Sequence, residues 1–73
     1  MGTTIGEIQK NATEKILVTE SEFKGRRFID VRVYFEGDDG EYKPTKKGIA
    51  LSGEVIDDVI EFLKEGSKKL KGE

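Results

Sequence analysis

Aromatic and basic residues alternate along the stretch of this 73-residue chain between Phe23 and Leu51. Its aromatic members include Phe23, Phe28, Tyr34 and Phe35, and its basic members include Lys24, Arg26, Arg27, Arg32, Lys43, Lys46 and Lys47. Aromatic rings stack on nucleobases while cations neutralise the phosphates between them, which suits an unpaired nucleic-acid strand rather than a duplex. A second interpretation stays open on pattern alone: the rings could be ordinary core or sheet-surface aromatics, and the cations could serve solubility.

The sequence contains few of the side chains that usually carry out catalysis. The chain has no histidine and no cysteine, so the usual general bases, thiol nucleophiles and soft metal ligands are missing. No base visible in the sequence could activate the serines Ser21, Ser52 and Ser67. The acidic cluster of Asp38, Asp39 and Glu41 does not have the spacing of a calcium loop and is typical of a solvated turn. We therefore expect no enzyme activity, no metal site and no cofactor.

The charge of the chain is acidic overall but unevenly distributed. The formal net charge is −2 and the isoelectric point is about 5.2, which taken alone argues against a polyanionic partner. Carboxylates crowd the segment from Glu54 to Glu65, whereas all three arginines and several lysines lie in the middle third, mixed with further acidic residues. A basic surface therefore forms only if folding separates the two signs.

The elements that must position these residues are several strands followed by one helix, which predicts an α+β fold. Extended segments are expected at Ile5 to Gln9, Lys15 to Thr19, Arg26 to Phe35, Tyr42 to Lys43 and Gly48 to Leu51. Turns are expected at Asn11 to Thr13, at Gly25 and at Gly37 to Gly40. Pro44 cannot donate to a ladder, so it marks an edge strand or an irregular stretch.

The strand from Arg26 to Phe35 has a two-residue period. One face carries Ile29, Val31 and Val33, and the other carries Arg26, Phe28, Asp30, Arg32 and Tyr34. By the same alternation Phe35 belongs to the apolar face with Val33. An exposed role for Phe35 therefore requires a bulge or a strand end just before Gly37.

The C-terminal third predicts an amphipathic helix, with Ser52 as its N-cap and Gly66 as a candidate cap at its end. The alternative is that the helix has a frayed continuation through Lys68 to Leu70. Its apolar stripe comprises Val55, Ile56, Val59, Ile60, Phe62 and Leu63. This stripe is wider than one small sheet can cover, and a domain of this size buries only about 60% of the surface of its unfolded chain. We therefore expect a homodimer in which these six residues form the interface, the alternative being that the stripe is entirely intramolecular core.

Five segments closely resemble the positive cofactor four family of transcriptional coactivators, in the same order and spacing. They are Phe23-Lys24-Gly25-Arg26, Ile29-Asp30-Val31-Arg32, Tyr34-Phe35, Gly40-Glu41-Tyr42-Lys43-Pro44 and Lys46-Lys47-Gly48-Ile49-Ala50-Leu51. The resemblance implies a curved four-stranded antiparallel sheet followed by one helix, as a homodimer that binds single-stranded DNA. The long regulatory segment of eukaryotic members is absent from this sequence, so a bacterial or phage form is plausible.

The resemblance also implies site residues. Phe23 and Phe35 fall on the family's base-stacking positions, the second of which is typically tryptophan. Family basic positions, expected to meet phosphate or bases, are matched by Lys24, Arg26, Arg32, Lys46 and Lys47, with Lys43 on a less certain one. Ser21 departs from the pattern, because a basic residue is usual there.

These observations predict one domain over residues 1–73 that binds single-stranded or melted DNA with little sequence preference. It would act inside the cell, in transcription regulation or in DNA replication, recombination or repair, with no membrane partner, because no apolar run is long enough to span a bilayer. The rival hypothesis is a protein-interaction module that recruits polymerase or recombination proteins through its acidic helix. Both hypotheses allow transcription or replication proteins as partners.

Overall fold

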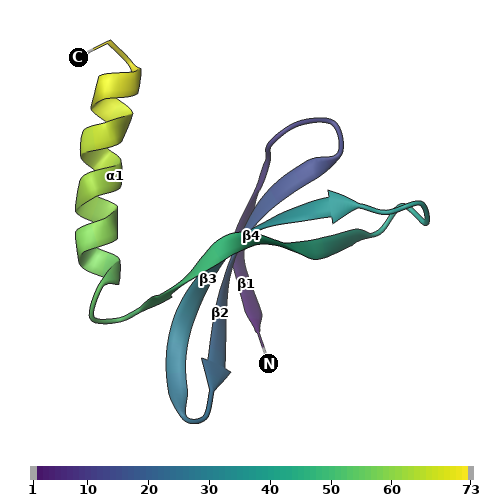
Figure 1. Ribbon diagram of the computed structural model, residues 1–73, viewed down its shortest axis with the longest axis horizontal. Coiled ribbons are helices and arrows are strands. Elements are labelled where there is room, and N and C mark those ends of the chain that lie inside the picture. The colour runs from purple at the N-terminus through teal and green to yellow at the C-terminus, as the bar shows by residue number, and fades with distance from the viewer. Residues whose placement is uncertain (1, 73) are drawn as a thin grey trace.

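A computed structural model describes residues 2–72, which form one antiparallel sheet followed by one helix. The strands are β1 (Thr3–Gln9), β2 (Glu14–Phe23), β3 (Arg26–Glu36) and β4 (Tyr42–Ser52), and the helix is α1 (Ile56–Leu70). Their order in the sheet is β1-β2-β3-β4, so each strand pairs with its neighbour in sequence (Figure 1). The predicted α+β fold with a curved four-stranded sheet and one C-terminal helix is confirmed. The two ends of the predicted domain, residues 1 and 73, lie outside the described part.

Two tight turns fix the hairpins of the sheet. Lys24 and Gly25 join β2 to β3 with φ values of 52° and 80°, so both central residues of this two-residue loop are left-handed. Such a loop matches the right-handed twist of the flanking strands. In the turn between β3 and β4, Gly40 has a φ of 82°. The turns predicted at Gly25 and at Gly37 to Gly40 are therefore confirmed.

Strand β4 is longer than the sequence predicted, and it is both an edge strand and irregular next to Pro44, as expected there. It is one strand where two short segments were expected, and Pro44 lies within it, opposite Tyr34. The pairing shifts between Arg32 opposite Gly48 and Tyr34 opposite Pro44. Three residues of β4, numbers 45 to 47, therefore face Val33 alone. We call this irregularity the β4 bulge. Pro44 is tolerated because β4 is an edge strand.

The start of helix α1 differs from the prediction. Ser52 is the last residue of β4, paired with Phe28, so it is not the N-cap. Val55 occupies that position without a side-chain hydrogen bond, and the helix begins at Ile56. At its other end the helix continues past Gly66 to Leu70, which is the expected alternative to a cap at Gly66. A glycine inside a helix costs only about 1 kcal/mol relative to alanine. Within residues 2–72, no helix has both the length and the apolar character needed to cross a membrane.

The described chain leaves nearly all of its apolar side chains at least partly exposed. Among residues 2–72 only Leu51 is a buried hydrophobic residue, with 6% of its surface exposed. Helix α1 extends away from the sheet and is joined to it by the short segment after β4 (Figure 1). Large exposed apolar residues are Ile5, Ile8, Phe23, Phe35, Ile49, Val55, Ile60, Phe62, Leu63 and Leu70. Hydrophobic burial drives folding, so a single chain of this shape has little to stabilise it.

Candidate nucleic-acid interface

The pairing of β2, β3 and β4 divides the candidate residues between the two faces of the sheet. Because side chains alternate along a strand, residues paired across neighbouring strands share a face. One face, here called the arginine face, carries Phe23, Arg26, Phe28, Asp30 and Arg32. The opposite face, here called the valine face, carries Val18, Val31, Val33 and Phe35. The two predicted base-stacking rings therefore lie on different faces.

Phe23 lies at the end of β2, beside the two-residue turn, and 67% of its surface is exposed. The Nζ atom of Lys24 is 5.4 Å from the centroid of its ring, within the range of a cation–π contact. An open pocket next to this ring is lined by Phe23, Arg26, Arg27, Phe28, Ala50, Ser52, Gly53 and Glu54. The structure thus brings three predicted residues together here: an accessible ring and the cations Lys24 and Arg26.

The guanidinium group of Arg32 is held in place by hydrogen bonds within the protein, unlike that of a free surface arginine. Its Nε and Nη2 atoms donate to the two carboxylate oxygens of Asp30, each at 2.9 Å, and its Nη1 atom donates to the carbonyl oxygen of Thr45 at 2.8 Å. The hydrogen bonds that Arg32 donates to Asp30 raise the pKa of Arg32 above its ordinary value. Only 26% of the side chain is exposed. Three of the five guanidinium N–H donors are therefore already in use.

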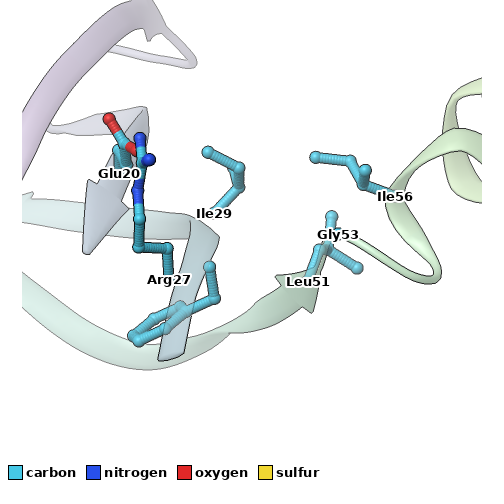
Figure 2. A pocket seen from close by; sticks show the side chains of 7 residues that line it. Glu20, Arg27, Ile29, Leu51, Gly53 and Ile56 are labelled. Atoms are coloured by element: carbon cyan, nitrogen blue, oxygen red, sulfur yellow. The ribbon is translucent and has the colours of Figure 1, made fainter. Parts of the chain in front are cut away.

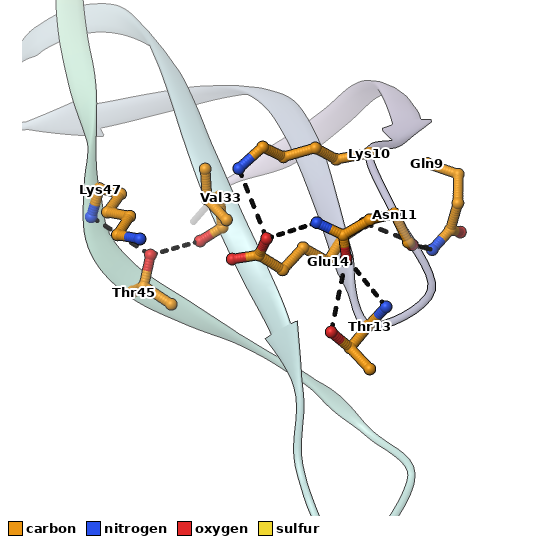
Figure 3. A network of polar contacts seen from close by, with 8 residues as sticks. All are labelled: Gln9, Lys10, Asn11, Thr13, Glu14, Val33, Thr45 and Lys47. Atoms are coloured by element: carbon orange, nitrogen blue, oxygen red, sulfur yellow. Dashed lines mark hydrogen bonds and ion pairs between the residues drawn. The ribbon is translucent and has the colours of Figure 1, made fainter.

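Lys46 and Lys47 lie in the β4 bulge, and both are exposed. The hydroxyl of Thr45 donates to the carbonyl oxygen of Val33 at 2.8 Å and accepts from the backbone N–H of Lys47 at 3.2 Å (Figure 3). The bulge interrupts the ladder of backbone hydrogen bonds between β3 and β4. The two bonds of the Thr45 hydroxyl satisfy backbone groups that this interruption leaves unpaired. The two lysines are thereby presented on an edge strand, where a passing phosphate backbone can reach them.

Phe35 and Lys43 are opposite each other on β3 and β4, on the valine face. The register between β2 and β3 runs without interruption to Phe35, so no bulge lies in β3. β3 ends at Glu36, one residue after Phe35, and Phe35 is 49% exposed although it shares a face with Val33. Ile49, on the same face within β4, is 57% exposed, so the described chain leaves this face partly uncovered. Of the two expected features, the strand end before Gly37 is present, and it leaves Phe35 on the valine face. The Nζ atom of Lys43 is 3.4 Å from a carboxylate oxygen of Asp39, an exposed ion pair of little strength.

Two polar groups in the structure were not among the predicted residues. Lys15 on β2 forms an ion pair with Glu7 at 2.8 Å, which raises the pKa of Lys15, and its Nζ atom is 4.4 Å from the ring centroid of Tyr42. In the turn before β2, Asn11 donates to the carboxylate of Glu14 at 2.6 Å and lowers its pKa (Figure 3). The group around Lys15 depends on strand register, which the sequence pattern does not supply, whereas the Asn11–Glu14 contact is local to the turn predicted at Asn11 to Thr13.

A small apolar pocket separates the sheet from the start of α1. Ile29 and Leu51 come from the sheet and Ile56 from the helix, and an Arg27–Glu20 ion pair lies at the rim (Figure 2). Ile56 and Val59 are half-buried, whereas the other four predicted interface residues are exposed by 44% to 74%. These four are Val55, Ile60, Phe62 and Leu63. The described chain therefore covers only part of the apolar stripe.

Within residues 2–72, no cluster of three or more acidic side chains could hold a metal ion.

The sequence and the fold both match known proteins. Residues 10–62 match the family model described as Transcriptional Coactivator p15 (PC4). A PC4 homologue from Burkholderia pseudomallei K96243, in its tetragonal crystal form, is 37% identical over 92% of this chain and 98% of that chain, with a TM-score of 0.86. Its orthorhombic form is 38% identical over 90% and 89% of the two chains, with a TM-score of 0.85.

A phage protein has the same fold at lower identity. It is the bacteriophage T5 homologue of the eukaryotic transcription coactivator PC4, implicated in recombination-dependent DNA replication. It is 18% identical over 99% of this chain and 98% of that chain, with a TM-score of 0.58. At this identity the likeness concerns the fold alone.

Proposed function

Because this chain belongs to the PC4 (positive cofactor four) family of transcriptional coactivators, we propose that it binds single-stranded or melted DNA as a homodimer, with little sequence preference and without catalysis. The observation that carries the proposal is the Phe23 ring, which is 67% exposed at the tip of a hairpin with Lys24 beside it and Arg26 paired across the strands. Water-exposed aromatic surface is costly, and stacking on a base would cover it.

The placement of the remaining candidates supports an unpaired strand as the ligand. Phe23 and Phe35 lie on opposite faces of the sheet, near opposite ends of β3, while Lys46 and Lys47 lie on the edge strand β4. A ligand that reaches both rings must bend around this edge over a short distance. Duplex DNA is stiff over about 150 base pairs, and bending it sharply costs several kcal/mol, whereas a single strand is flexible.

The second copy in the proposed homodimer would lie on the apolar stripe of α1. That stripe is partly uncovered in the described chain, and an 8.2 kDa domain without disulfides gains much from a partner subunit. The dimer interface is proposed to contain Val55, Ile56, Val59, Ile60, Phe62 and Leu63. Transcription regulation follows from the family, and the phage homologue, implicated in recombination-dependent DNA replication, makes replication and recombination further candidate processes inside the cell.

The two lysines of the β4 bulge provide the first test. Salt weakens single-strand binding with a logarithmic slope of about −0.7 per phosphate neutralised, so replacing both Lys46 and Lys47 with alanine should flatten the slope by roughly one unit or slightly more. Fluorescence anisotropy of a labelled oligonucleotide of about 20 nucleotides, from about 50 mM salt upward, measures it.

A matched control removes the same number of charges elsewhere. Lys68 and Lys69 lie in the last turn of α1, away from the sheet, so their double alanine variant should bind with the parent slope. An unchanged slope after loss of Lys46 and Lys47 would remove these lysines from the site. If the parent protein showed no affinity for the oligonucleotide at about 50 mM salt, the interaction-module hypothesis based on the acidic helix would replace the proposal.

A further inference from the structure

Asp30 is a carboxylate in the middle of the proposed DNA-binding surface, where a negative charge should repel phosphate. It lies on the arginine face, on a half-buried position of β3, and both of its oxygens accept from Arg32 at 2.9 Å. A bidentate arginine–carboxylate pair fixes the plane and direction of the guanidinium. The position of Asp30 therefore decides where Arg32 points.

Arg32 points across to the edge strand and reaches the β4 bulge. Its third bond is donated to the carbonyl oxygen of Thr45, the first of the three residues that face Val33 alone. The hydroxyl of Thr45 then bonds the backbone on both sides, to Val33 and to Lys47. One chain of hydrogen bonds thus connects Asp30, through Arg32 and Thr45, to the backbone of Lys47.

Gly48 provides the room for this arrangement. A Cβ atom at this position would lie 2.8 Å from the guanidinium carbon of Arg32 and 2.8 Å from the carbonyl oxygen of Val31. Such distances are too short for any side chain, so the guanidinium can lie against β4 only where residue 48 is glycine. The glycine next to the two lysines is explained by packing, since its backbone does not require a positive φ.

We propose that Asp30, Arg32 and Thr45 form a clamp that holds the β4 bulge and so positions Lys46 and Lys47 for phosphate. The inference rests on the proposed DNA-binding function. In it Arg32 does more than supply a positive charge, because it also holds the β4 bulge in place. Asp30 is then a positioning residue that increases affinity for an anionic ligand although it is itself an anion.

The Asp30→Asn variant separates the clamp from simple electrostatics, because the two predict opposite signs. Removal of a carboxylate from the surface should tighten DNA binding if charge alone matters. Loss of the clamp should weaken binding about five-fold or more and flatten the salt slope by roughly one unit, because the lysines no longer meet their phosphates. The slope is informative because partial unfolding lowers the active fraction without changing the number of phosphates neutralised.

Glu41→Gln is the matched control, since Glu41 is an exposed carboxylate one residue before β4 and lies outside the clamp. It should bind as tightly as the parent or slightly more tightly, with the parent slope. Thr45→Val removes the two hydrogen bonds of the hydroxyl while keeping the shape of the side chain. It should weaken binding and flatten the salt slope as Asp30→Asn does, and it provides the test if Asp30→Asn folds poorly.

The outcomes distinguish the clamp from the function on which it rests. The clamp alone would be overturned if the parent bound single-stranded DNA and the Asp30→Asn and Thr45→Val variants bound it as tightly as Glu41→Gln does. A parent without affinity for the oligonucleotide would overturn the proposed function first. Weaker binding and a flatter slope in both clamp variants, with Glu41→Gln unchanged, is the expected result.

Discussion

Replacing Leu63 with glutamate is expected to eliminate the homodimer. Leu63 lies on the apolar stripe of α1 and is 66% exposed in the single chain, so a second copy is needed to cover it. In a self-complementary interface the substitution buries an unpaired charge twice, once per subunit. Each buried charge lowers the stability of the dimer by about 3–5 kcal/mol. Light scattering should give twice the 8.2 kDa chain mass for the parent and a monomeric or unfolded species for the variant.

Lys64→Glu is the control for this experiment, because it introduces the same residue at the next position, which is already polar and exposed. It should remain dimeric. A parent that has the monomer mass at micromolar concentration would contradict the proposed assembly, as would a Leu63→Glu variant that remains a folded dimer. Because folding and association are linked in such dimers, the melting temperature of the parent should also rise with protein concentration.

Phe23→Ala is expected to have the largest effect on DNA binding of any substitution that leaves the fold intact. Loss of one stacking ring should weaken single-strand binding by about 1–3 kcal/mol, roughly five- to a hundred-fold. The salt slope should stay nearly unchanged, because no phosphate contact is lost. Since the ring is 67% exposed, its removal should cost much less stability than the roughly 3–5 kcal/mol typical of a buried phenylalanine.

Phe35→Ala tests the second ring by the same titration. Phe35 is less exposed, at 49%, and shares a face with Val33, so thermal melts of both variants must accompany the binding curves. A variant that melts like the parent and binds weakly supports stacking. If both variants fold normally and bind as tightly as the parent, the two rings are not the stacking platform.

The elements of this fold could largely be predicted from local sequence signals. β-branched and aromatic residues predicted β3 almost to its ends, and the turn at Gly25 followed from glycine's tolerance of positive φ. The predicted start of α1 was wrong because Ser52 resembles an N-cap in sequence but is engaged in pairing with Phe28. Local capping signals cannot reveal such a competing long-range pairing.

The sequence proposed the candidate site as a set of residues, and their arrangement came only from the structure. Family resemblance named Arg32 and Lys47, yet only the register shows that a bulge lies between their strands and that Thr45 connects them. Bulges depend on how two strands align, which alternation within one strand does not encode. Pro44 is the usable signal in the sequence, because it marks an edge strand or an irregular stretch and the bulge begins at the next residue.

A competition titration tests the proposed single-strand binding most directly. A labelled single-stranded DNA of about 20 nucleotides is bound to the protein at one stated salt concentration, and unlabelled single-stranded DNA, duplex DNA of the same sequence and RNA are compared as competitors. We predict that single-stranded DNA displaces the label at far lower concentration than duplex does, because only unpaired bases can stack on Phe23. Base stacking does not depend on the 2′-hydroxyl, so RNA serves to measure whether the sugar matters. Duplex competing as well as single-stranded DNA would contradict the proposed stacking interface.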